Sequence, residues 1–456
     1  MYHSYSRKLI EALLIANSFL PPSLLLARDD IPITPPSATA FSTSKPPVLD
    51  GEILNDAAWQ IAAPITGFWQ TTPDEGQAAT QNTEVRVLFT NDTLYFGVVC
   101  FDNETERIIV SDSRRDSPLD ETDCFQIILD TYHDKQNGFV FGTNPAGIEY
   151  DAQVTNEGQS DVANVRQQGG AVGGFNINWD GAWEVRTKVS EVGWCAEFAI
   201  PFRTLRYKKG ESQTWGLNFQ RNIRRRKEAA FWSPLPRQFT LLRLSQAGIL
   251  QGLKIASQRN LKVMPYVLGE SKFHELDQIN SEQWHGDLGA DVKYSLTPGL
   301  TLDATSNTDF AQVEVDDQQI NLDRFNLFFP EKRPFFLENA GLFSVGSPGE
   351  VEIFFSRRIG LDANGHAVPI IGGARVSGNV GPSAIGFLNM QTESLGDTLH
   401  ANNFTVARFK QELPHRSNLG AIFVNRQGTG KLAPEEDYNR ARSRSMANSA
   451  SASLAK

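Results

Sequence analysis

Five aspartates that could carry chemistry gather in one segment of the chain: Asp112, Asp116, Asp120, Asp123 and Asp130. Glycoside hydrolysis needs two carboxylates that face each other across a sugar ring, and carboxylate oxygens also bind calcium. The segment has no EF-hand spacing, and one sequence does not fix the gap between two carboxylates. We interpret these aspartates as solvated loop acids and assign no catalytic residue, and calcium binding stays open as an alternative.

Motifs of the common catalytic centres are absent from the sequence. It contains no HExxH, no GxSxG, no P-loop and no zinc-type cysteine spacing, and its seven histidines are scattered. His133, in the string DTYHD, is expected in a turn. If the protein is an enzyme, a glycosidase acting on O-glycosyl bonds is the expected class, with no residue identified to carry the reaction.

Tryptophans outside regular strand patterns are the candidate binding residues. Trp69 follows Gly67 and Phe68, Trp179 lies in NINWDG, and Trp232 precedes Ser233 and Pro234. An exposed indole can stack on the C–H face of a sugar while polar neighbours bind its hydroxyls. We therefore predict that these three residues bind carbohydrate.

The elements that would position these loops read as β-strands. The run 84–89 leads through a turn into 94–101, LYFGVVCF, which is apolar throughout and so predicts a strand buried on both faces. Three later strands alternate with period two and place Trp183, Trp194 and Trp215 on their apolar phase. Trp59, in LNDAAW, is expected in a short helix packed on the strands. The series predicts an antiparallel β-sandwich with these four tryptophans in its core or against it.

The length of the chain and its net charge limit the number of domains and the classes of partner that we expect. The chain has 456 residues, too many for one ordinary core, and its net charge of −10 disfavours a nucleic-acid partner. The basic run 221–227 is interpreted as a solvated strand end. The three cysteines, Cys100, Cys124 and Cys195, argue against a disulfide scaffold. Cys100 and Cys195 are expected to be buried apolar residues, although one pair could bridge in an oxidising compartment.

The N-terminus predicts export. Arg7 and Lys8 precede an apolar stretch that ends near Ala27, so residues 1–27 are predicted as a signal peptide and 28–45 as a linker. No other segment has an apolar run long enough for a transmembrane helix.

The second half alternates as well. Strands are expected at 287–296 and 300–305, then near 351–358, 370–380, 384–392, 402–412 and 418–426, each about ten residues long. That length crosses a bilayer when tilted, but a soluble sandwich could show the same pattern. Residues 254–430 are predicted as one domain and 431–456 as a low-complexity tail.

The first half resembles a family of sugar-binding modules. PPVLDGEILNDAAW (46–59) and WDGAWEVRTKVSEVGWCAEFAIPFRTLRY (179–207) are similar to the opening and closing parts of carbohydrate-binding module family nine, and the likeness covers 46–253. The resemblance implies a β-sandwich that binds sugar chain ends between aromatic rings, often with calcium, and is commonly attached to glycoside hydrolases.

The second half resembles a different domain. NLDRFNLFFPEKRPFFLENAGLF (321–343) and FFSRRIG (354–360) are similar to a bacterial outer-membrane β-barrel domain of unknown function that follows such modules. Its phenylalanines beside charges suit a membrane–water interface or a barrel mouth; the alternative is a packed inter-strand loop. Related proteins continue further, so we expect an incomplete barrel here.

Together these patterns predict an all-β protein, a β-sandwich followed by an incomplete outer-membrane-type β-barrel. The first hypothesis is carbohydrate binding at the bacterial outer membrane or cell surface in polysaccharide catabolism, with sugar and membrane lipid as partners. The alternatives are a glycoside hydrolase, and an outer-membrane transporter or assembly protein with a periplasmic sandwich.

Overall fold

The computed structural model describes residues 35–158, 174–208, 210–255, 261–276, 279–308, 331, 333–343, 345–347, 351–361, 368–394, 400–413, 417–429 and 451–455. Residues 36–456 form one compact unit. The predicted signal peptide and most of the predicted tail lie outside the described residues.

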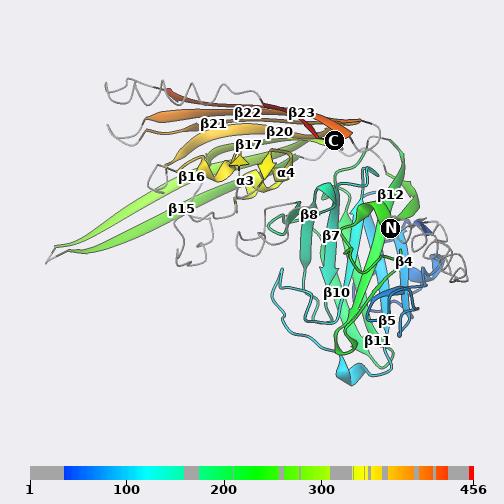
Figure 1. The fold of residues 1–456 in the computed structure, drawn as a ribbon. Helices are drawn as coiled ribbons and strands as arrows, with labels where there is room; N and C mark the ends of the chain where they lie inside the picture. The colour runs from blue at the N-terminus through cyan, green and yellow to red at the C-terminus, as the bar shows by residue number, and fades with distance from the viewer. Residues whose placement is uncertain are drawn as a thin grey trace, which may run out of the picture. The chain divides into compact units, whose positions relative to one another are not determined.

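Two sheets make a sandwich in the first half of the chain (Figure 1). The larger sheet contains β1 (Ser37–Thr39), β14 (Gly248–Lys254), β12 (Ser212–Ile223), β6 (Cys124–Asp130), β7 (Gly138–Thr143), β8 (Tyr150–Val154) and β9 (Phe175–Asn176), in that order, with β13 (Glu228–Phe231) on β12 and β3 (Trp69–Thr72) on β13. The smaller sheet runs β10 (Glu184–Ser190), β11 (Gly193–Pro201), β5 (Thr93–Phe101), β4 (Thr83–Phe89) and β2 (Phe41–Ser42). Only the pairings of β1 and β2 are parallel among these described strands, so the predicted antiparallel sandwich is confirmed except at these two short edges.

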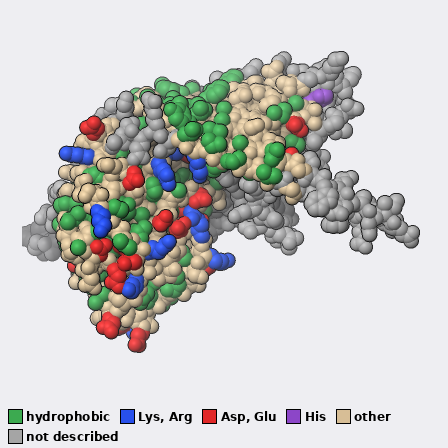
Figure 2. All heavy atoms as spheres, turned by 180° about the vertical axis from the view of Figure 1, so that it is seen from behind, with side chains coloured by type: hydrophobic (Ala, Val, Ile, Leu, Met, Phe, Trp, Pro, Cys, Tyr) green, Lys and Arg blue, Asp and Glu red, His purple; other side chains and the backbone are tan. Residues whose placement is uncertain are grey.

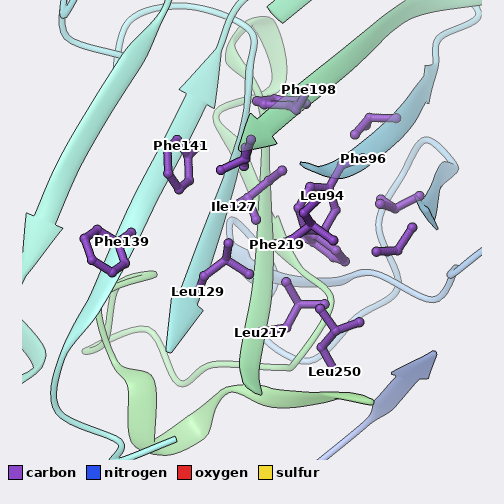
Figure 3. Packing of buried hydrophobic residues seen from close by; sticks show 14 of the residues in the cluster. Leu94, Phe96, Ile127, Leu129, Phe139, Phe141, Phe198, Leu217, Phe219 and Leu250 are labelled. Carbon is purple, nitrogen blue, oxygen red and sulfur yellow. The ribbon is translucent and has the colours of Figure 1, made fainter. Parts of the chain in front are cut away.

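The core forms where the two sheets face each other. Phe96 of β5 and Phe219 of β12 meet edge to face with ring centroids 6.0 Å apart, and Figure 3 shows both pointing into the same apolar layer. Burying one such ring contributes roughly 1.5–3 kcal/mol. The period-two pattern of the sequence therefore corresponds to the inward face of each sheet.

β5 is apolar throughout because both of its faces are covered, as its sequence predicts. Phe96 and Val98 lie in the main core, whereas Tyr95 and Val99 pack in a second cluster with Trp59. Trp59 begins the short helix η1 (Trp59–Ile61), is fully buried and donates its indole N–H to Glu197 at 2.7 Å. The predicted core positions of Trp183, Trp194 and Trp215 are confirmed as well.

The basic run 221–227, at the end of β12, is not a solvated strand end. Arg221 is buried, and its guanidinium donates to the carbonyls of Asn82 and Phe101, each at 2.7 Å. Arg225 is also enclosed and donates to both carboxylate oxygens of Asp102. These arginines hold separate loops of the sandwich together, and the local sequence gives no sign of partners more than a hundred residues away.

All three cysteines are buried, which confirms the expectation for Cys100 and Cys195. Cys100, Cys124 and Cys195 are all buried and free, so no pair bridges. Burial raises the pKa of the Cys195 thiol to about 11 and that of Cys100 to about 12. Neither thiol forms a nucleophilic thiolate near neutral pH.

An eight-stranded antiparallel sheet follows in the second half (Figure 1). Its order is β15 (Leu261–Leu276), β16 (Ile279–Thr297), β17 (Leu300–Thr308), β20 (Ile370–Val380), β21 (Ser383–Thr392), β22 (Ala401–Leu413), β23 (Ser417–Thr429) and β24 (Ser451–Ala455). Four of the predicted strands coincide with β20 to β23. The predicted strand at 351–358 is wrong: this segment holds the two-residue β19 (Val351–Glu352), paired with β18 (Gly346–Ser347), and the helix η6 (Ser356–Arg358).

The two faces of this sheet differ in chemistry. One row across neighbouring strands reads Lys293, Asp303, Arg375, Leu388, Val406 and Val424. The adjacent row, which points to the opposite face, reads Tyr294, Leu302, Val376, Phe387, Ala407 and Phe423. We call the first the inner face and the second the outer face.

The phenylalanine-rich segment covers the inner face. Phe335, Phe336 and Phe343 are buried there with Leu388 and Val406. They belong to or flank α3 (Pro334–Leu337) and α4 (Ala340–Phe343). This is the packed inter-strand arrangement, so the interpretation of these three rings as residues at a membrane–water interface is wrong; Phe328 and Phe329 lie outside the described residues.

Its charges are buried because they satisfy one another. The Glu331 carboxylate accepts two hydrogen bonds from the Arg333 guanidinium, at 2.7 and 2.8 Å, and one from Ser356. Arg333 also donates to the carbonyl of Ile359 and lies over the ring of Phe336, 4.2 Å from its centroid. Charged and aromatic residues therefore alternate here to fold a connection onto the sheet.

The described residues confirm an all-β fold with very little helix. None of their helices has the length and apolar character needed to span a bilayer.

Candidate functional site

Trp69 has the largest exposed indole face of the three tryptophans proposed for binding. It begins β3, pairs with Phe231 of β13 and Ala78, and is 42 % exposed. Its neighbours Phe68 and Gln70 are both buried. The period of two along an extended chain therefore turns Trp69 outward, away from the core that Phe68 enters.

The hairpin that carries Trp69 is held by Gln70. The Gln70 backbone N–H donates to Gln77 and its side-chain amide donates to Ala78, both at 2.8 Å. On the other side of the strand, the Thr71 hydroxyl donates to the carbonyl of Leu235 at 2.9 Å. Asp74, Glu75 and Gln77 are exposed in the same hairpin. The arrangement offers an apolar ring on a fixed strand beside a polar loop.

Trp179 is a core residue, contrary to the expectation of an exposed platform. It is 6 % exposed and packs against Phe139, with ring centroids 4.9 Å apart, and against Phe141. A Cβ at Gly181 would lie 2.8 Å from the indole, so glycine there makes room for the ring. The loop that follows β9 turns this tryptophan inward, which its turn-like sequence does not reveal.

Trp232 is likewise buried, at 5 % exposure. Its ring lies 5.6 Å from that of Phe219, and a Cβ at Gly248 would clash with it at 2.6 Å. Phe231, the residue before it, is buried in a different cluster, so the chain is covered on both sides at this point. Of the three predicted binding residues, Trp69 alone keeps an open face, and the structure does not bring the three together.

The aspartates of 112–130 do not form one site. Asp123 and Asp130 are buried, which corrects their interpretation as solvated acids. The Asp123 carboxylate accepts the backbone N–H groups of Ile109 and Arg224, and Asp130 accepts those of Asp134 and Lys135. Burial raises the pKa of both carboxyls above its ordinary value. Asp120 is exposed, as expected.

Arg115 gathers acids that the sequence keeps apart. Its guanidinium lies 2.6 Å from Asp151, 2.7 Å from Asp180 and 3.3 Å from Asp116, and it also contacts Glu149. Burial raises the pKa of Asp151 to about 6, against the opposing effect of its hydrogen bond from Gly181 and of Arg115. The guanidinium occupies the centre of this cluster. Within the described part of the chain, no three histidine, cysteine, aspartate or glutamate side chains are placed to hold a metal ion.

Two family models match separate parts of the chain. Residues 49–232 match the carbohydrate family 9 binding domain-like model. Residues 258–380 match a domain of unknown function, DUF5916. The first match covers the part of the chain that contains Trp69 and most of the sandwich.

Solved structures are similar at low identity. A family 9 carbohydrate-binding module from Caldicellulosiruptor kristjanssonii in complex with cellotriose is 15 % identical, with a TM-score of 0.33, over 48 % of this chain and 95 % of that one. The same organism's family 9 module in complex with glucose gives 15 % identity and a TM-score of 0.34, over 48 % and 97 %. No curated protein matches the chain.

Proposed function

We propose that the sandwich binds carbohydrate and that Trp69 supplies the stacking surface. The match of residues 49–232 to the family 9 binding-domain-like model supports the class of ligand. The observation that carries the site is the 42 % exposure of Trp69 on a strand whose neighbouring residues are buried. A pyranose on that indole would bury apolar area on both partners, while the exposed side chains of Asp74, Glu75 and Gln77 could bind its hydroxyls.

A panel of soluble oligosaccharides tests this proposal. The full chain should bind at least one neutral oligosaccharide, cellotriose being one member of the panel, and binding should quench tryptophan fluorescence. A panel without any binding would overturn the proposal.

We propose in addition that the outer face of the second sheet contacts lipid, in an exported protein of the bacterial outer membrane. Figure 2 shows hydrophobic side chains gathered over the upper part of the molecule. The exposed apolar residues of the outer face include Val267, Leu288, Phe387, Phe409 and Phe423. A patch of this kind on a soluble monomer would favour aggregation, whereas bilayer hydrocarbon would cover it.

The connections between strands suggest which side of the bilayer the sandwich would occupy. At one end of the sheet, two or three residues separate β16 from β17, β20 from β21 and β22 from β23. At the other end two residues separate β15 from β16, but longer segments separate β17 from β20 and β21 from β22. At the first end, Tyr132 of the sandwich donates to the carbonyl of Gly299 at 3.3 Å, and the Tyr207 N–H donates to Pro298 at 3.4 Å. Because outer-membrane proteins place their short turns in the periplasm, a periplasmic sandwich follows from this proposal.

A further inference from the structure

A cavity of about 990 Å³ opens beside the sandwich, away from Trp69. Its walls are the turn between β6 and β7, the end of β8 with the segment that follows it, the start of α4, and the ends of β20 to β23. The volume is at the upper end of the range for small-molecule sites and would hold several sugar rings.

Side-chain amides give the walls their hydrogen-bonding capacity: Gln136, Asn137, Gln153, Asn339, Asn379 and Asn418. Gln153 and Asn339 fix each other: the Gln153 amide donates to Asn339 Oδ1, and the backbone N–H of Asn339 donates to Gln153 Oε1, both at 3.2 Å. An amide offers both a donor and an acceptor, which is the match for a sugar hydroxyl. The lining therefore suits a ligand rich in hydroxyls better than an apolar one.

The charges of the lining leave a positive excess. Its acids are occupied: Glu157 pairs with Arg243, the Asp134 carboxylate accepts the N–H groups of Gln136 and Asn137, and Glu412 lies 3.9 Å from Lys410. Arg206 is bound to Glu338. The ion pairs compensate Glu157 and Glu412, whereas Asp134 keeps its negative charge, because hydrogen bonds from backbone N–H groups do not cancel it.

Lys135, Lys208 and Arg408 supply the excess, because no ion pair holds any of them among the described residues. Lys135 and Lys208 flank His133, and burial together with these two lysines lowers the pKa of that imidazole. Two buried nitrogens at the cavity have no hydrogen-bond partner, His133 Nδ1 and Arg408 Nε. Cations therefore face the cavity from the sandwich wall and from the sheet wall.

We propose that this cavity binds a short acidic oligosaccharide, whose hydroxyls meet the amides and whose carboxylates meet Lys208 and Arg408. The site goes beyond the neutral-sugar surface at Trp69, and one can be present without the other. An uncharged oligosaccharide would leave the cations unused, and a small inorganic anion would leave the amides unused.

Calorimetric titration of the full chain with trigalacturonate, with its trimethyl ester and with inorganic phosphate tests the proposal. We expect the acid to bind at least tenfold more tightly than the ester, and phosphate to bind more weakly than either. The double variant Lys208→Gln/Arg408→Gln should lose at least tenfold for the acid, whereas Lys254→Gln, an exposed lysine of β14, should bind as the parent does.

Equal binding of the acid and the ester by the parent would overturn the proposal, and so would a folded double variant that binds as the parent does. If the double variant fails to fold, the comparison of acid and ester on the parent still decides. Trp69→Ala should bind trigalacturonate as the parent does. Loss of the cavity site would therefore abolish binding of the acid, whereas loss of the Trp69 site would abolish binding of the neutral sugar only.

Discussion

Arg206 of the sandwich and Glu338 of the segment on the second sheet form an enclosed ion pair, with Nη2 and Oε1 2.6 Å apart. Lys293 of β16 also contacts Glu338, and Arg375 pairs with Asp303 beside it at 2.8 Å. The charged end of the inner face thus becomes a binding surface for the sandwich, within one compact unit.

Replacement of Glu338 by glutamine should destabilise the protein by about 3 kcal/mol or more, because it leaves the guanidinium of Arg206 buried without its counter-charge. Glu52→Gln is the matched control, since Glu52 and Lys188 form an exposed pair, and it should have little effect on the free energy of unfolding. Urea unfolding of both variants measures the difference. Equal effects would mean that the Arg206 pair is not a structural link.

Replacement of Trp179 should destabilise the fold, because its side chain lies in the core. Trp179→Ala should cost about 3–5 kcal/mol of the free energy of unfolding through the cavity it leaves between Phe139 and Phe141. Trp69→Ala, by contrast, should leave the melting temperature close to that of the parent. Thermal melts of both variants check this, and a marginal effect of Trp179→Ala would contradict its place in the core.

The features that the sequence predicts correctly are those set by the period-two alternation of apolar residues along a strand. Trp183, Trp194 and Trp215 lie on the inward phase of strands that alternation identifies, and the unbroken apolar run of β5 predicts that both of its faces are covered. The features that the sequence did not predict depend on contacts between residues far apart in the chain. Arg115 and Arg221 find theirs in segments far along the chain, and the loop around Trp179 folds inward because Phe139 and Phe141 offer a packing surface.

Asp151 should make the free energy of unfolding fall as pH rises. Its pKa is about 6 in the fold and about 3.9 when unfolded, so the folded state holds the proton more tightly. This contribution to stability is full below about pH 4 and falls as pH rises towards 6, by at most about 3 kcal/mol before screening by solvent around Arg115. Asp151→Asn should flatten the decline in urea stability between pH 4 and 6; an unchanged slope would rule out a raised pKa there.

Lipid contact by the outer face predicts sensitivity to charge. The double variant Phe387→Asp/Phe423→Asp should fold less into phospholipid vesicles. On the lipid face of a membrane strand, a basic residue at the bilayer midplane costs about 2–4 kcal/mol and an aspartate costs somewhat less. Asp substitutions at the exposed sandwich positions Val48 and Val192 are the control and should have little effect. Equal incorporation of both double variants would argue against lipid on this face.

Titration of the full chain and of its Trp69 variants with the tightest neutral oligosaccharide of the panel tests the central claim most directly. Stacking on the exposed indole predicts that Trp69→Ala binds about thirtyfold more weakly, the equivalent of roughly 2 kcal/mol, and that Trp69→Phe recovers part of the loss. Both variants should have melting temperatures close to that of the parent. A Trp69→Ala protein that remains folded and binds the sugar as tightly as the parent would contradict the account.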